Sequence, residues 1–215
     1  MPYVITIDGP AMAGKTTTAK ALADALGFRH VNTGAVYRAL AVWQCRHPSC
    51  PIGAHNVSGA LVDKNGACTQ IMREGETDLG PYLYTAEASD MSSRISEDPE
   101  VRRAANGIIR DICKDHDIVV EGRDTGSALF PNADLKIYLY ADVEARTRRM
   151  RPGDKAGKTV EQCMADLEAR DHRDSTRACD PLVRTEDMIL VDNENLSVQE
   201  TVQTICVLWR NGHAD

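Results

Sequence analysis

The chain has 215 residues, of which 42% are hydrophobic and 27% charged, and its formal net charge at pH 7 is −7. This length fits one α/β domain with room for a small insert. The negative charge argues against nucleic acid or an acidic membrane surface as the main partner.

The chain starts with an apolar, β-branched run, Tyr3 to Ile7, which predicts a strand and leaves no room for a signal peptide. No apolar run approaches the length of a membrane span. The seven cysteines are odd in number and contain no C-x-x-C pair, a pattern more typical of a reducing compartment than of a disulfide framework. We therefore expect a cytoplasmic protein with no membrane partner.

The segment directly behind this strand, Gly9 to Thr16, has the pattern G-x-x-x-x-G-K-[ST]. Such a loop surrounds nucleotide phosphates with backbone N–H groups and places its lysine at the β- and γ-phosphates. Apolar residues at helical spacing from Ala19 to Leu26 predict a following helix that ends at Gly27. An ordinary glycine-rich turn is the alternative, but the strand and helix favour a nucleoside triphosphate site. The predicted phosphate cradle is Gly9, Pro10, Ala11, Met12, Ala13, Gly14, Lys15, Thr16 and Thr17.

Helices and short strands alternate along the rest of the chain, which predicts a parallel sheet with right-handed crossovers. Helices are expected over 34–46, from an Asp98-Pro99 cap to about 114, after Asp142, and after a capping box at 197–200. Strands are expected over 117–121, 134–140 and 188–191. An Asn-Gly turn between two strand-like runs, from about 57 to 73, predicts a hairpin and hence an inserted subdomain.

Cys45, His47, Cys50 and His55 are all zinc-ligand types in one short run. Two prolines interrupt the run, and its spacing is shorter than the usual paired-ligand patterns. We favour a loop with incidental thiols and keep zinc as the alternative.

The segment 146–177 is basic, with nine Lys and Arg against six Asp and Glu, in an otherwise acidic chain. It indicates a second surface for anions, with a solvated helix face as the alternative. Arg170, Arg173 and Arg177 are spaced so that one helix face can present all three.

Further polar motifs fall at expected strand ends and helix starts, where a parallel sheet binds its ligands. They read N-T-G-A-V-Y-R (32–38), S-x₅-P-x-V-R (93–102), E-G-R-D-T-G (121–126), F-P-N-A-D-L-K-I (130–137), R-D-H-R-D-S-T-R (170–177) and P-L (181–182). Together with I-D-G-P (7–10), this ordered series resembles the bacterial-type cytidylate kinases over nearly the whole chain.

The resemblance implies an α/β fold: a P-loop parallel β-sheet flanked by helices, with an inserted monophosphate-binding subdomain and a short lid. It implies a single kinase domain over 1–215, with the core at about 1–40, 98–150 and 178–215, the insert at about 41–97 and the lid at about 151–177. We also expect a monomer.

The implied activity is ATP-dependent phosphorylation of CMP and dCMP, with Mg²⁺ held near Thr16. The residues agree with it, because a phosphate monoester is largely dianionic at neutral pH and needs no protein base. Two polyanions repel each other, so arginines must bring them together. The expected catalytic residues are Lys15, Arg123, Arg151, Arg170 and Arg177.

The resemblance also assigns roles in acceptor binding. Arg38, Arg123 and Arg177 would hold the acceptor phosphate, and a carboxylate, an arginine and a serine would read the cytosine edge. The expected substrate-binding residues are Thr33, Tyr37, Arg38, Ser93, Arg102, Arg123, Asp124, Asp174 and Arg177, of which Asp124, Arg102 and Ser93 read the base, Tyr37 packs near the nucleotide and Asp174 accepts from the sugar. Arg151 and Arg170 would lie on the lid side of the donor, with Arg146, Arg149 and Arg173 as weaker candidates.

The chain departs from the family pattern in four places. In the P-loop, Ala11-Met12 replaces a glycine-containing pair and Thr16-Thr17 replaces a Gly-Thr pair, which leaves Thr17 as the alternative Mg²⁺ ligand. Asn32 replaces an aspartate, and Leu83-Tyr84-Thr85 stands where an Arg-Thr pair is common. A kinase for another nucleoside monophosphate or a small metabolite, and a non-catalytic nucleotide-binding protein, remain as alternatives. A metabolite kinase would need a carboxylate base, and a guanine-reading N-K-x-D motif is absent from the sequence.

Overall fold

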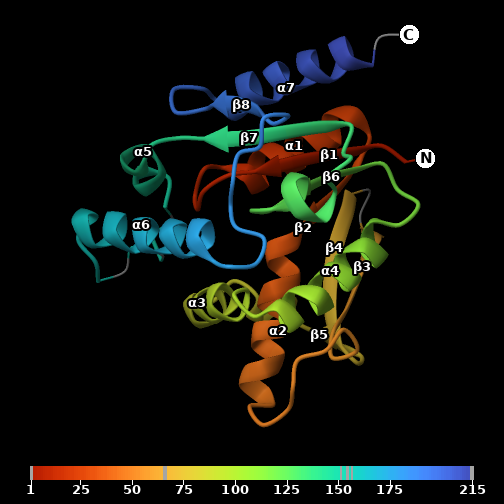
Figure 1. Ribbon diagram of the computed structural model, residues 1–215, viewed down its shortest axis with the longest axis vertical. Coiled ribbons are helices and arrows are strands. Elements are labelled where there is room, and N and C mark those ends of the chain that lie inside the picture. The colour runs from red at the N-terminus through yellow and green to blue at the C-terminus, as the bar shows by residue number, and fades with distance from the viewer. Residues whose placement is uncertain (1, 65–66, 151, 154, 156, 214–215) are drawn as a thin grey trace.

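The computed structural model describes residues 2–64, 67–150, 152–153, 155 and 157–213. Its central sheet has five parallel strands in the order β2-β6-β1-β7-β8, which confirms the predicted parallel α/β architecture (Figure 1). The strands are β1 Val4–Asp8, β2 Arg29–Asn32, β6 Ile118–Glu121, β7 Leu135–Tyr140 and β8 Ile189–Asp192. The carboxyl ends of β2, β6 and β1 therefore lie side by side, at one edge of the sheet.

Helices α1 (Lys15–Leu26) and α7 (Val198–Gly212) cover one face of the sheet. Ile5, Ile7 and Val119 point to this face and are fully buried against the helices. The helix α1 ends at Gly27 in the left-handed conformation, as predicted. The capping box predicted for α7 is present as well.

The other face is covered by α2 (Thr33–Arg46) and α4 (Pro99–Cys113). The Asn32 side chain caps α2 by accepting from the Ala35 N–H at 3.1 Å. Asp98 caps α4 by accepting from the Glu100 N–H at 2.8 Å, with Pro99 as the first helical residue, as predicted. Both caps fix helix starts at the edge of the sheet where ligands are expected.

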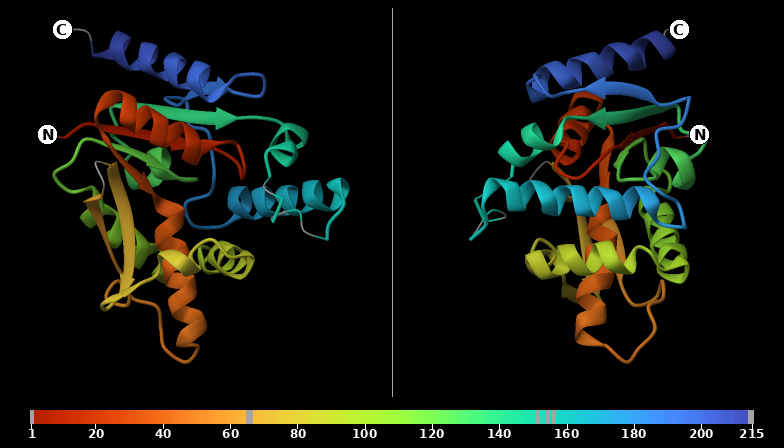
Figure 2. Two further views of the ribbon diagram at one scale, coloured as in Figure 1. Left: turned by 180° about the vertical axis from the view of Figure 1, so that it is seen from behind. Right: turned by 60° about the vertical axis from the view of Figure 1, so that its left-hand side comes forward.

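The predicted hairpin is formed by β3 (Ser58–Lys64) and β4 (Ala67–Glu74), followed by β5 (Thr77–Asp78). Its Asn65-Gly66 turn lies outside the described residues. With α3 (Ala86–Ile95), the hairpin extends away from the central sheet alongside α2 (Figures 1 and 2). Its buried residues belong to the same hydrophobic cluster as those of α2 and α4, so this part of the fold has no core of its own. The exact domain limits stay a prediction.

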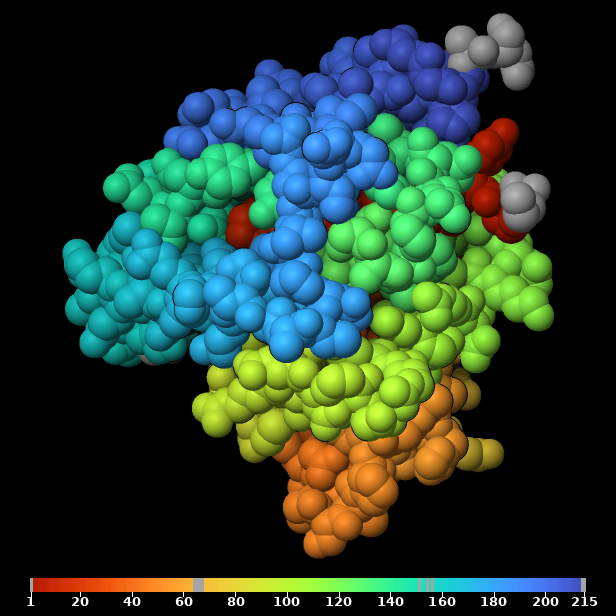
Figure 3. Space-filling view, viewed as in Figure 1, coloured from red at the N-terminus to blue at the C-terminus, as the bar shows by residue number. Residues whose placement is uncertain are grey.

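Helices α5 (Val143–Arg148) and α6 (Val160–Thr176) form an arm beside the sheet (Figure 2). Asp142 caps α5, as predicted, and its carboxylate accepts from the Ala145 N–H at 2.6 Å. The connection from α6 to β8 crosses the front of the molecule (Figure 3). Of the helices in the described ranges, none combines the length and the apolar character needed to cross a membrane.

Candidate active site

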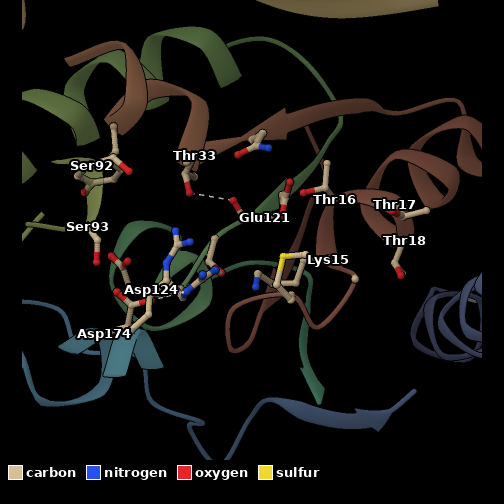
Figure 4. Close-up of a pocket in the computed structure, with 18 of the residues that line it drawn as sticks. Lys15, Thr16, Thr17, Thr18, Thr33, Ser92, Ser93, Glu121, Asp124 and Asp174 are labelled. Carbon is tan, nitrogen blue, oxygen red and sulfur yellow. Dashed lines mark hydrogen bonds and ion pairs between the residues drawn. The ribbon is translucent and has the colours of Figure 1, made fainter. Parts of the chain in front are cut away.

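A cavity of about 510 Å³ opens at the carboxyl ends of the central strands. The P-loop and the start of α1 line one side, and α2, α3 and the segment behind β6 line the other. Figure 4 shows Lys15 and Thr16 on the first side and Ser93, Asp124 and Asp174 on the second. The cavity thus has two chemically different ends, one lined by the P-loop and the other by Ser93, Asp124 and Asp174.

The P-loop has a backbone that glycine makes possible at two points. Gly9 has φ of 149°, and a Cβ there would lie 2.1 Å from the carbonyl oxygen of Leu139. Gly14 has φ of 90°. Met12 also has a positive φ, 60°, although a side chain makes this conformation cost on the order of 1 kcal/mol. The departure at Ala11-Met12 therefore leaves the turn in place, with the Met12 side chain on the cavity wall.

Two helices outside the loop hold its backbone. Asp171 of α6 accepts from the Ala11 N–H at 2.8 Å, and Arg146 of α5 donates to the Ala11 carbonyl at 2.9 Å. Arg146 and Asp171 are themselves paired at 2.5 Å. Arg146, a weaker candidate for the donor, thus lies behind the loop and not on the cavity wall.

Arg149 and Asn193 support the loop from the β8 side. The Asn193 amide donates to the Ala13 carbonyl at 2.9 Å, and Arg149 donates to the Asn193 carbonyl at 2.7 Å. Both side chains line the cavity together with Leu196, Val198 and Thr201. Of these residues, only Arg149 was identified from the sequence. Asn193, Leu196, Val198 and Thr201 belong to no motif whose residue types and spacing indicate nucleotide binding.

Lys15 folds back onto its own loop. Its Nζ donates to the carbonyls of Gly9 at 2.8 Å and Pro10 at 2.6 Å, and the side chain is buried. Burial, with Arg123 nearby, lowers the pKa of Lys15 well below its ordinary value. A phosphate group bound at the loop would supply the negatively charged partner that Lys15 lacks among its hydrogen-bond acceptors.

Thr16 and Glu121 offer hard oxygen ligands on the same wall. Glu121 ends β6, beside the P-loop strand, and its buried Oε1 has no hydrogen-bond partner within the described chain. Although burial opposes ionisation, His30 at 3.6 Å and Lys15 hold the pKa of Glu121 below its ordinary value. An ionised carboxylate with one oxygen that makes no hydrogen bond in the described chain, beside a P-loop threonine, fits Mg²⁺. The signal in the sequence was an acid at the end of a buried strand.

The Cys45 to His55 run is no metal centre in this structure. Among the described residues no group of three or more His, Cys, Asp or Glu side chains could hold a metal ion. His47 instead pairs with Glu74 at 2.7 Å and packs on the ring of Trp43. Cys45 and Cys50 are exposed and free.

Between the two ends of the cavity lie three half-buried arginines, Arg38, Arg123 and Arg170. Arg123 donates to Asp174 at 2.7 Å, whereas the Nε atoms of Arg38 and Arg170 find no acceptor in the described part of the chain. Burial, together with Arg123, lowers the pKa of Arg170 to about 10, and burial also lowers that of Arg38. Desolvated cations without full neutralisation are what an anionic ligand requires.

Asp124 lies at the far end, between two arginines. Its Oδ1 accepts from Arg177 at 2.7 Å and its Oδ2 accepts from Arg102. Burial raises the pKa of Asp124 to about 6, although both arginines act in the opposite direction. The nearby Ser93 hydroxyl is buried and, as far as the structure describes the chain, makes no hydrogen bond.

The cavity brings most of the predicted site residues together. Arg102 is an exception, because it is 1% exposed and lies behind Asp124 instead of on the wall. Arg151 lies outside the described residues. Also off the wall are Arg173 and four residues of the predicted phosphate cradle, Gly9, Pro10, Ala11 and Ala13. The predicted residues on the wall are Met12, Gly14, Lys15, Thr16, Thr17, Thr33, Tyr37, Arg38, Ser93, Arg123, Asp124, Arg170, Asp174 and Arg177.

A parallel sheet with a P-loop, and a second anion-binding end facing that loop, define a small P-loop kinase fold. Solved structures agree on the fold. A shikimate kinase from Bacteroides thetaiotaomicron has a TM-score of 0.52 at 12% sequence identity, with 96% of this chain and 97% of that chain covered. A shikimate kinase from Acinetobacter baumannii has a TM-score of 0.50 at 15% identity, with 100% and 97% covered.

Sequence relatives give the family. The family model described as cytidylate kinase matches residues 5–211. The cytidylate kinase of Thermotoga petrophila is 40% identical over 98% of each chain, and that of Chlamydia pneumoniae is 38% identical over 97% of this chain and 99% of its own. The chain belongs to the cytidylate kinase family, which confirms the resemblance seen in its motifs.

Proposed function

We propose that this protein transfers the γ-phosphoryl group of ATP to CMP and dCMP, forming CDP and dCDP. The observation that carries the proposal is the single cavity with a P-loop at one end and the Ser93–Asp124 pair at the other. Family membership supports it, since the curated relatives are named cytidylate kinases. The half-buried arginines between the two ends are suited to two phosphate groups that would otherwise repel each other.

At the donor end, the P-loop N–H groups bind the triphosphate and Lys15 turns from its own loop carbonyls to the β- and γ-phosphates. Thr16 and Glu121 would hold Mg²⁺ there. When bound, the ion neutralises phosphate charge and orients the donor. Arg149 and the start of α7 would contact the rest of the donor nucleotide.

At the acceptor end, Arg38 and Arg123 hold the acceptor phosphate and Arg170 lies between it and the donor. A phosphate oxygen of the dianionic acceptor attacks the γ-phosphorus in line while the bond from that phosphorus to the β–γ bridging oxygen breaks. No proton has to be removed from the attacking oxygen, so no protein base is needed. The arginines stabilise the charge on the transferring group.

Asp124 and Ser93 read the base. The Asp124 carboxylate accepts from the cytosine N4 amino group, and the Ser93 hydroxyl donates to a ring acceptor. Uracil would turn a carbonyl oxygen toward the carboxylate, which is unfavourable. Tyr37 would pack near the nucleotide and Asp174 would accept from the sugar, where it must share its carboxylate with Arg123.

We further infer a monomer in the cytoplasm. One chain supplies both ends of the cavity, so no partner copy is needed to complete the site. All seven cysteines are free, which suits a reducing compartment.

An acceptor panel tests the proposal. ADP release from ATP is measured with CMP, dCMP, UMP and AMP; CMP and dCMP should be phosphorylated efficiently and UMP poorly. Lys15→Ala should abolish transfer to all four while the protein keeps its fold, as measured by circular dichroism. Equal turnover of CMP and UMP would contradict the assignment of the base pocket, and a Lys15→Ala variant with normal kcat would contradict the donor site.

A further inference from the structure

Asp180, in the connection between α6 and β8, contacts both arginines that hold Asp124. Its carboxylate Oδ2 accepts from Arg102 Nε at 2.9 Å. Its backbone carbonyl accepts from Arg177 Nε at 2.8 Å and Nη2 at 2.5 Å. Asp180 does not line the cavity, so any effect on a ligand passes through these two side chains.

The backbone at Asp180 is bent for this contact. Its φ is 46°, in the left-handed region, where Asp and Asn are tolerated better than most residues. The turn directs the Asp180 carbonyl at the Arg177 guanidinium, which the Cys179 carbonyl also accepts from at 3.1 Å. One residue thus fixes one arginine through its backbone and the other through its side chain.

Three side-chain ion pairs link Asp180, Arg102, Asp124 and Arg177 in series, and the Asp180 backbone carbonyl, which accepts from Arg177, closes the ring. Arg102 lies between Asp124 and Asp180, and Arg177 lies between the Asp124 carboxylate and the Asp180 carbonyl. Arg102 is 2% exposed at its side chain and Arg177 is 4% exposed. Loss of the Asp180 side chain would take one acceptor from Arg102, which would then be held only by Asp124 and the Ser96 carbonyl, whereas Arg177 would keep the backbone carbonyl of residue 180.

We propose that Asp180 is a positioning residue for pyrimidine recognition, which locks Arg102 and Arg177 so that Asp124 faces the base with its carboxylate in one orientation. This inference rests on the proposed function and adds to it a residue outside the cavity. It assigns Arg102 a different task from direct base contact, namely to hold Asp124 from behind.

The charged and titratable groups that face Asp124 come from every neighbouring element. They are Arg102 from α4, Arg177 and Asp180 from the end of α6 and beyond, Asp8 from β1 and Tyr37 from α2. Asp8 and Asp180 act to raise the pKa of Asp124, and the two arginines act to lower it. Removal of the Asp180 charge should therefore lower the pKa of Asp124.

Two substitutions separate charge from geometry. Asp180→Asn keeps the shape, the left-handed backbone and an acceptor oxygen for Arg102, but not the charge. Asp180→Gly removes the whole side chain and also tolerates the positive φ, so neither variant strains the turn. Asp187→Ala is the matched control, because Asp187 lies in the same connection and pairs with buried Lys136 away from the cavity.

We expect Asp180→Gly to raise the KM for CMP about tenfold, with kcat and the KM for ATP within about twofold of wild type. Asp180→Asn should recover part of the loss, and Asp187→Ala should change none of the three. The ratio of kcat/KM for CMP to that for UMP should fall most in Asp180→Gly, less in Asp180→Asn and not at all in Asp187→Ala. A folded Asp180→Gly variant with wild-type KM for CMP, or an equal loss for ATP and CMP, would overturn the proposal.

Titration of the Asp124 carboxyl carbon by NMR gives an independent readout. Its midpoint should move to lower pH in Asp180→Asn, and an unchanged midpoint would contradict the charge coupling. This titration and the equilibrium binding of CMP need no turnover. If the wild-type enzyme phosphorylated none of the four acceptors, the proposed function would fail, while these two measurements would still decide the role of Asp180.

Discussion

At the scale of single residues, Asp124 is a carboxylate whose charge state is set by competition between burial and two arginines. Its pKa is raised to about 6, so it is ionised at neutral pH and gains a proton as the pH falls through that value. The ionised form accepts from a cytosine amino group, whereas the protonated form can donate to a uracil carbonyl. Base selectivity should therefore depend on pH.

We predict that the ratio of kcat/KM for CMP to that for UMP falls as the pH is lowered through about 6. The ratio is the proper measure, because the phosphate groups of CMP and UMP titrate near the same pH. The effect of that titration on kcat/KM is therefore the same for both acceptors and drops out of the ratio. In Asp124→Asn the ratio should stay level across the range. A wild-type ratio that does not change between neutral and acidic pH would show that the Asp124 charge does not select the base.

Tyr84, where the family pattern commonly has an Arg-Thr pair, stacks on Arg38 in this chain. The Arg38 guanidinium carbon lies 4.8 Å from the centre of the Tyr84 ring, and the ring is 65% exposed. An exposed cation–π contact contributes about 0.5–1 kcal/mol, so Tyr84→Leu should raise the KM for CMP about two- to fivefold. Tyr84→Phe keeps the ring and should bind CMP like wild type; an equal loss in both variants would exclude stacking as the cause.

At the scale of elements, side chains of α5 and α6 form hydrogen bonds with the backbone of the P-loop. Asp171 and Arg146 bind the N–H and the carbonyl of Ala11, respectively. These contacts join positions more than a hundred residues apart, and they hold the loop in the shape that its glycines permit. The arm formed by α5 and α6, which carries the basic segment, therefore supports the proposed donor site.

Asp171→Ala should raise the KM for ATP about tenfold, because the Ala11 N–H and Arg146 both lose an acceptor and the loop is no longer held in place. The KM for CMP should change little, because Asp171 contacts the P-loop and does not line the acceptor end of the cavity. Glu168→Ala, an exposed position on the same helix, is the control for general effects on α6. Steady-state kinetics with each substrate varied in turn checks the prediction; a larger change for CMP than for ATP would contradict it.

Local signals explain which elements could be predicted. The P-loop, the caps at Asp98 and Asp142, the capping box of α7 and the hairpin all depend on residues within a few positions of one another. The limits that the sequence patterns predicted agree with the structure to within one or two residues, whereas β2 and α3 were not predicted. Arg102 is placed behind Asp124 by an ion pair, and Ala11 is held by hydrogen bonds with Asp171 and Arg146; both depend on residues far apart in the chain, for which the sequence has no local pattern.

At the scale of the whole molecule, the fold places the P-loop and the proposed base-reading pocket at opposite ends of one cavity. The sheet fixes the loop through β1, and the core shared by α2, α4 and the hairpin fixes the acceptor side. Glu121, which lines the cavity between the two ends, begins the E-G-R-D motif, but no role was predicted for it from the sequence. The proposed function therefore requires that one end of the cavity binds the donor nucleotide and the other end binds the acceptor nucleotide.

Competition between acceptors tests this account most directly. Wild-type enzyme and Asp124→Asn are each given ATP with equal concentrations of CMP and UMP at neutral pH, and CDP and UDP are separated and quantified. Wild type should form CDP almost exclusively, and Asp124→Asn should lower the CDP to UDP ratio by about one to two decades, because the amide loses the charge-assisted bond to N4 and can donate to O4. If the variant lost activity with CMP and UMP by the same factor, leaving the ratio unchanged, Asp124 would not read the base and the account of this cavity would be wrong.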